Sequence, residues 1–162
     1  KMIDALSGKK VVGVSAGSYH TVVWTERGEL YTFGKGDGEH ESEVKPRLVH
    51  ALAEKRVVGA SAGYIHTVAW THGGEVFTLG NGHDMPLGQG PTESEHAGLP
   101  MLLQALVQKK VVGALTCVHY TIVWSETGDL RMYGRADGIR LGLGKLYGKA
   151  EEHMRCLMAA LD

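Results

Sequence analysis

Short β-type segments separated by glycine turns make up most of the chain. Residues 21–25, 67–71 and 121–125 are runs of β-branched and aromatic side chains, a composition typical of strands. Each run is followed by a turn that ends in glycine, and then by a second segment such as 30–34, in which polar and apolar positions alternate. The pattern predicts three β-hairpins.

Two further strands complete each predicted unit. An apolar segment, residues 11–15 in the first unit, precedes the hairpin. A fourth strand is expected around residues 48–49 and 102–103, each shortly after a proline, Pro46 or Pro100. Four short strands in about 50 residues, repeated along the chain, are typical of the blades of a β-propeller.

The same sequence recurs three times. Residues 11–36 and 57–82 are close copies, and residues 111–136 are a diverged third copy. The spacing of 46 and 54 residues is given by the equivalent glycines Gly13, Gly59 and Gly113. We expect one repeat domain over residues 1–162, with units at approximately 5–50, 51–104 and 105–160.

Each of the first two copies carries a composite motif. Gly-x-x-His-Thr starts at Gly17 and again at Gly63, and a Glu-x-aromatic-Thr-x-Gly segment follows, ending at Gly34 or Gly80. A trailing glycine-rich element is best matched at residues 138–144. Together, and in register, these motifs resemble the regulator of chromosome condensation repeat over essentially the whole chain.

The resemblance implies an all-β fold, because members of this family usually close a ring of about seven blades. Three units cannot close such a ring, so we expect three four-stranded blades that form an open segment of a seven-bladed ring. The third copy departs from the motif, with Cys117 and Tyr120 in place of glycine and histidine. The open edges are expected to be covered by further blades, by another copy of the chain or by a larger complex.

The recurring histidines, tryptophans and glycines are the candidate site residues. His20 and His66 could form a ligand or an acid–base pair, but their repetition favours a structural hydrogen bond to neighbouring backbone. The tryptophans are expected to pack between blades or on a sheet face, and not to form a binding platform. The residues assigned to the structural repeat are Gly17, His20, Trp24, Gly28, Gly34, Gly63, His66, Trp70, Gly74, Gly80, Trp124, Gly128 and Gly134.

Charge and composition argue against nucleic-acid binding and against metal-dependent or catalytic functions. The 17 basic and 18 acidic side chains give a net charge of −1, without the basic excess of a nucleic-acid-binding protein. Basic pairs at 9–10, 55–56 and 109–110 are interpreted as solvated blade edges, although a basic rim for an acidic partner is the alternative. The histidines and the two cysteines lack metal-ligand spacing, so no metal, cofactor or catalytic residue is expected.

No apolar run has the length of a membrane span, and the first residues do not resemble a signal peptide. We therefore expect an intracellular protein, cytoplasmic or nuclear. Residues 149–161 could form a short amphipathic helix or the start of another strand.

The favoured function is a non-enzymatic protein–protein interaction or scaffold module that binds partners through the variable loops on one rim. The resemblance also implies an alternative, guanine-nucleotide exchange on a small GTPase, which the founding member of the family catalyses. Chromatin binding is a third hypothesis, which the near-neutral charge supports weakly.

Overall fold

The computed structural model describes residues 3–34, 43–80, 99–118 and 120–134. In these residues the chain forms three antiparallel sheets and three 3-10 helical turns. The first unit contains η1 (Asp4–Leu6), β1 (Val11–Ala16), β2 (His20–Thr25), β3 (Leu30–Gly34) and β4 (Glu43–Leu48). The second contains η2 (His50–Leu52), β5 (Val57–Ala62), β6 (His66–Thr71), β7 (Val76–Gly80) and β8 (Met101–Leu102). The third contains η4 (Gln104–Leu106), β9 (Val111–Thr116), β10 (Tyr120–Ser125) and β11 (Leu130–Gly134).

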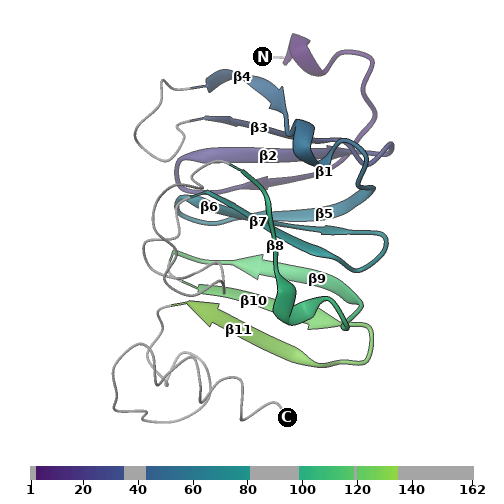
Figure 1. The fold of residues 1–162 in the computed structure, drawn as a ribbon. Coiled ribbons are helices and arrows are strands. Elements are labelled where there is room, and N and C mark those ends of the chain that lie inside the picture. Colours follow the sequence, from purple (N-terminus) through teal and green to yellow (C-terminus); the bar gives the residue numbers. More distant parts are fainter. Residues whose placement is uncertain (1–2, 35–42, 81–98, 119, 135–162) are drawn as a thin grey trace.

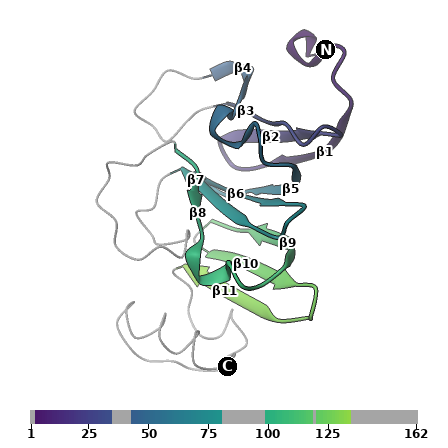
Figure 2. The same ribbon diagram turned by 45° about the vertical axis from the view of Figure 1, so that its right-hand side comes forward.

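Each sheet is one blade, and the three blades stack on one another as open sheets (Figure 1 and Figure 2). The strand orders are β1-β2-β3-β4, β5-β6-β7-β8 and β9-β10-β11, all with antiparallel neighbours. The predicted all-β propeller fold is confirmed. The predicted fourth strand of the third blade lies beyond residue 134, outside the described residues, as does the candidate helix at 149–161.

The fourth strand of the first blade differs from the prediction. It was expected after Pro46, but β4 begins at Glu43 and contains this proline. Proline lacks the N–H that a central strand donates, and it is tolerated here because β4 lies at the edge of its sheet. In the second blade, β8 covers only Met101 and Leu102, and Leu103 continues the pairing by donating its N–H to the Val76 carbonyl at 2.8 Å.

The sequence analysis does not predict the 3-10 turns, each of which contains an Ala-Leu pair, at 5–6, 51–52 and 105–106. Leu52 and Leu106 each have 1% of their surface exposed, and each fills the space between two blades. The core is therefore divided into one layer per junction. The first layer contains Val22, Leu30, Leu52, Val57, Ala60, Ala62, Ala69 and Phe77. The second contains Val68, Val76, Leu103, Leu106, Val111, Ala114, Val123 and Tyr133.

Candidate functional site

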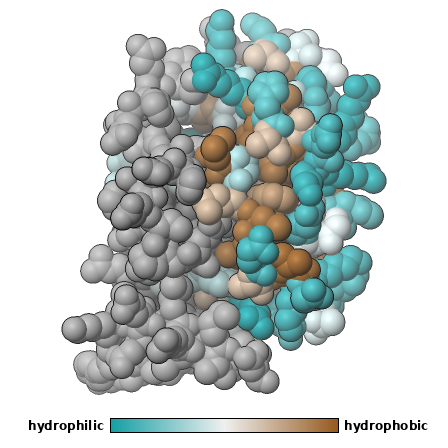
Figure 3. Space-filling view, in the orientation of Figure 1, coloured by the Kyte–Doolittle hydropathy of each residue, from teal (hydrophilic) through white to brown (hydrophobic). Residues whose placement is uncertain are grey.

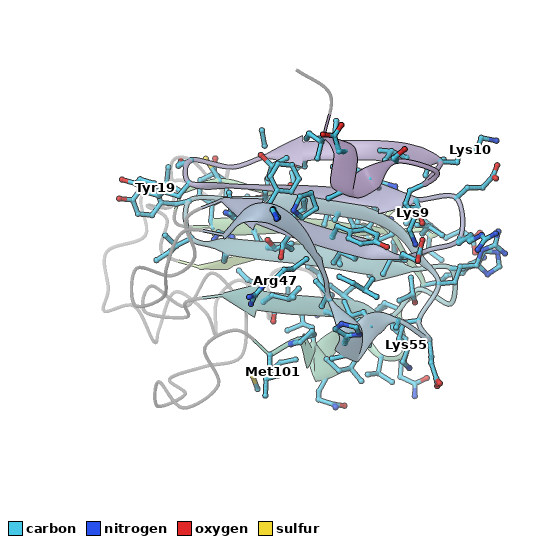
Figure 4. The ribbon with its side chains drawn as sticks, turned by 90° about the horizontal axis from the view of Figure 1, so that it is seen from above. Lys9, Lys10, Tyr19, Arg47, Lys55 and Met101 are labelled. Atoms are coloured by element: carbon cyan, nitrogen blue, oxygen red, sulfur yellow. The ribbon has the colours of Figure 1, made fainter. Side chains whose placement is uncertain are left out.

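Two opposite rims of the stack carry different chemistry. Seen from above, Tyr19 lies at one end of the first blade, and Lys9, Lys10 and Lys55 lie towards the other (Figure 4). We call the first end the tyrosine rim; it is formed by the β1–β2 turn and its equivalents. The second end, formed by the β2–β3, β6–β7 and β10–β11 turns and by the segments before β1, β5 and β9, is the charged rim. Hydrophilic side chains cover this second end in the space-filling view, and apolar ones gather between the rims (Figure 3).

The basic pairs of the charged rim are largely neutralised by carboxylates. Lys9 Nζ lies 2.6 Å from Glu29 Oε1, and the same pairing recurs between Lys55 and Glu75 at 2.9 Å. The third blade repeats it with an aspartate, and the neighbouring lysines pair as well. These additional pairs are Lys109–Asp129 at 3.0 Å, Lys10–Glu26 at 2.6 Å and Lys110–Glu126 at 2.9 Å.

The pairing also shifts the titration of these groups. The hydrogen bond from Lys9 to Glu29 raises the pKa of the Lys9 ammonium group. The same bond lowers the pKa of the Glu29 carboxyl. A hydrogen bond from Lys109 likewise lowers the pKa of Asp129. A cavity of about 320 Å³ on this rim is lined by the Lys9–Glu29 and Lys10–Glu26 pairs. Because the two lysines of this cavity already face carboxylates, they are poor partners for phosphate.

The two recurring histidines lie inside the blade junctions. His20 Nε2 is 2.7 Å from Thr67 Oγ1 of the second blade, and His66 Nε2 is 3.2 Å from Thr121 Oγ1 of the third. Burial lowers the pKa of His20, which favours the neutral imidazole at neutral pH. The expected partner was a backbone group, and the structure shows a threonine side chain of the next blade instead. The two imidazoles belong to separate junctions and do not converge on one site.

A serine adds a second polar contact to each junction. Ser15 Oγ accepts a hydrogen bond from the Ala62 N–H at 3.0 Å. Ser61 Oγ accepts one from the Thr116 N–H at 2.9 Å, and its hydroxyl also lies 2.9 Å from Thr116 Oγ1. Sequence reasoning missed the serines, although their signal was visible as Ser-x-Gly-x-x-His in the first two copies.

The tryptophans pack against glycines within their own blades. The Trp24 indole lies across Gly13 on the adjacent strand, where a Cβ would overlap the ring, and Trp70 lies across Gly59 in the same way. Trp124 and Gly113 repeat the arrangement. Trp24 and Trp70 also contact the first and second core layers, respectively. Each of the three indoles therefore packs within its own blade, and they do not form one aromatic platform.

The glycines of the β2–β3 and β6–β7 turns allow the blades to approach closely. Gly28 and Gly74 have φ angles of +82° and +83°, and their carbonyls accept hydrogen bonds from Val57 N and Val111 N of the following blade. Gly128 has a similar positive φ, but nothing lies within 4 Å of the place where a side chain would start. Of the remaining assigned glycines, Gly34, Gly80 and Gly134 are the last residues of β3, β7 and β11, and Gly17 and Gly63 begin the turns that follow β1 and β5.

The tyrosine rim carries an exposed aromatic pair that the sequence analysis did not single out. The rings of Tyr19 and Tyr64 meet edge to face with centroids 5.0 Å apart, and their hydroxyls lie 3.3 Å apart. Tyr19 is 44% exposed, and Val118, at the position after the third turn's Cys117, is 42% exposed. Tyr19 and Val118 therefore expose apolar surface on this rim.

Neither a metal centre nor a membrane span is found among the described residues. In this part of the chain, no three His, Cys, Asp or Glu side chains gather closely enough to hold a metal ion. Within residues 3–34, 43–80, 99–118 and 120–134, no helix is both long and apolar enough to cross a membrane.

Stacked antiparallel blades, two with four strands and one with three strands among the described residues, are joined by repeating contacts and define a repeat protein of the β-propeller class. The sequence profile of the regulator of chromosome condensation (RCC1) repeat matches residues 11–38, which is most of one copy. The chain belongs to the RCC1 repeat family, as its motifs predicted.

Comparisons with individual proteins agree with this membership. The chain is 37% identical over 163 residues to the E3 ubiquitin-protein ligase HERC2 of human and of mouse. This alignment covers 96% of the chain but only 3% of the relative. Human WBSCR16 superimposes with a TM-score of 0.71 at 22% identity, covering 88% of this chain and 37% of that one. Prp20p of Saccharomyces cerevisiae superimposes with a TM-score of 0.68 at 20% identity, covering 79% of this chain and 31% of Prp20p.

Proposed function

We propose that the chain is a non-enzymatic protein-interaction module, whose partner binds at the tyrosine rim. The observation that carries the proposal is the contact between the exposed Tyr19 and the half-buried Tyr64, which come from the turns of two adjacent blades. Tyrosine is enriched in protein interfaces because it supplies large contact area with few rotatable bonds. The recurring histidines and serines support the same proposal, since each is engaged in a blade junction.

The proposal includes an intracellular location, cytoplasmic or nuclear. Prp20p supports the nuclear option, because that protein binds Gsp1p and histones. HERC2 is a ubiquitin ligase, but the chain spans 3% of that protein, so we propose no ligase activity for it.

The test of this proposal compares two rims of one molecule. The purified chain, a Tyr19→Ser/Tyr64→Ser variant and a Lys10→Ser/Lys110→Ser variant are immobilised in parallel and exposed to the same cell lysate. We expect a reproducible set of proteins bound by the wild type and by the lysine variant, and reduced about tenfold or more on the tyrosine variant. Equal binding by all three would contradict a tyrosine-rim site, and thermal unfolding of each variant checks that it remains folded.

Guanine-nucleotide exchange is the second candidate, and the binding of Prp20p to Gsp1p favours it. It is tested separately, by the release of a fluorescent guanine nucleotide from a panel of small GTPases. We expect no acceleration by the chain. Acceleration at sub-micromolar concentration would overturn the non-enzymatic proposal in favour of exchange activity.

A further inference from the structure

The second blade breaks the pattern of ion pairs on the charged rim. Lys10 of the first blade, at the charged end in Figure 4, pairs with Glu26 at 2.6 Å. Lys110 of the third blade pairs with Glu126 at 2.9 Å. Arg56 stands at the position of these lysines in the second blade, and its side chain is exposed. The other two copies therefore show what normally faces a cation at this position.

A histidine replaces the carboxylate in the second blade. His72 stands at the position of the two glutamates, and its N–H donates to the Arg56 carbonyl at 2.8 Å. The third blade has the same backbone contact at the same distance, so the local geometry is kept and the carboxylate is lost. No carboxylate of the described residues pairs with Arg56. Glu54, two residues before it, is exposed and forms no ion pair in this part of the chain.

A second arginine adjoins the first. A Cβ at Gly28 would lie 2.8 Å from Arg56 Cα and 3.0 Å from its Cγ, so the arginine stem lies against the β2–β3 turn. Arg27 is the preceding residue of this turn; it is exposed, and no described carboxylate pairs with it. Arg27 also lines the cavity of about 320 Å³. The next junction has Gly73 at the position of Arg27, so in the described chain two arginines adjoin only at the first junction.

The surroundings limit the size of an anion that this place can bind. The lysines on both sides are neutralised, and the carboxylates of Glu26 and Glu126 would repel a long polyanion. The net charge of −1 also gives no extended basic track for nucleic acid. A compact anion is therefore favoured over a long one.

The donors favour phosphate over carboxylate. One guanidinium fork is enough to bind both oxygens of a carboxylate. Two guanidinium groups match a phosphate monoester better, because it carries a charge of about −1.5 to −2 and three acceptor oxygens. The N–H of a neutral imidazole can donate a further hydrogen bond.

We propose that Arg27, Arg56 and His72 form a recognition site for a phosphorylated side chain of a partner protein. The site lies on the charged rim, opposite the tyrosine rim, and is distinct from the interaction surface proposed above. Its two guanidinium groups bind the phosphate oxygens by charge-assisted hydrogen bonds. The neighbouring lysines do not share this role, because each already holds a carboxylate.

The test measures the binding of the purified full chain to immobilised peptide pools at an ionic strength of about 0.15 M. The pools have a random sequence around one fixed central residue, which is phosphoserine, phosphothreonine, phosphotyrosine, glutamate or serine. We expect at least one phosphorylated pool to bind about tenfold or more tightly than the glutamate and serine pools. Equal binding of the glutamate pool, or no binding of any phosphorylated pool, would overturn the proposal.

Three variants that each lower the net charge by one locate the binding. Arg56→Gln removes the central guanidinium, and His72→Glu restores the carboxylate that the other two blades have. We expect both to bind the phosphorylated pool about tenfold or more weakly than wild type. Lys110→Gln, which removes a cation already paired with Glu126, should bind as wild type does. Equal loss in all three variants, or full binding by Arg56→Gln, would overturn the site, and thermal unfolding checks that each variant is folded.

A single-stranded DNA oligonucleotide of about 20 nucleotides tests the other source of phosphate. We expect it to bind more weakly than the phosphorylated pool, because the carboxylates beside the site repel a chain of phosphates. Tighter binding of the oligonucleotide that Arg56→Gln abolishes would overturn the assignment to a protein partner.

Discussion

The Gly59→Ala variant is expected to lose about 2–3 kcal/mol of its free energy of unfolding. The added methyl group would occupy space held by the Trp70 indole, which lies directly across Gly59 on the neighbouring strand. The indole cannot withdraw without disturbing the second core layer, on which it packs. Urea unfolding followed by tryptophan fluorescence measures the loss.

Gly73→Ala is the matched control for this substitution. A Cβ at Gly73 would meet only Thr71 Oγ1, at 3.8 Å, and the residue is exposed in the turn after β6. We expect a change within about 0.5 kcal/mol of wild type. Equal losses from both substitutions would show that Trp70 does not require a glycine opposite it.

The Leu52→Ala variant is expected to lose about 3 kcal/mol, which makes it the second large effect. Leu52 is 1% exposed in the 3-10 turn η2, where it fills the layer between the first and second blades. Its removal takes away apolar contact and leaves a cavity that the two rigid sheets can close only in part. The same unfolding measurement gives the loss.

The repeat again provides the control, Leu6→Ala. Leu6 occupies the same position in η1, but no preceding blade covers it in the described chain, and none of the η1 residues is buried. We expect a loss below about 1 kcal/mol. If Leu6→Ala destabilised the chain as much as Leu52→Ala, the layers between blades would not be the source of its stability.

Much of the fold was predictable because each unit repeats its local signals. The β-branched runs, the turn glycines and the 46- and 54-residue spacing together indicate strands, hairpins and blades, and the observed strands follow them. The 3-10 turns were missed because three residues such as Asp4–Leu6 carry no hydrophobic period. The start of β4 was placed too late because the sequence does not show which strand lies at an edge, and only an edge strand accepts Pro46.

The junction contacts were less predictable than the blades. A repeated histidine indicates a structural role, but its partner is 47 residues away in the sequence, and spacing alone does not pair His20 with Thr67. The Tyr19–Tyr64 contact is of the same kind, since two turns of different blades bring it together. The histidine contact repeats at the second junction, as His66 with Thr121, whereas the tyrosine contact does not, because Val118 stands at the position of Tyr64 in the third copy.

The recurring histidines join neighbouring blades, and a double-mutant cycle between His20 and Thr67 measures how strongly one such pair is coupled. The free energies of unfolding are compared for wild type, His20→Phe, Thr67→Val and the double variant. The 2.7 Å contact between His20 Nε2 and Thr67 Oγ1 predicts a coupling energy of about 1 kcal/mol. Additive effects within about 0.3 kcal/mol would contradict the claim.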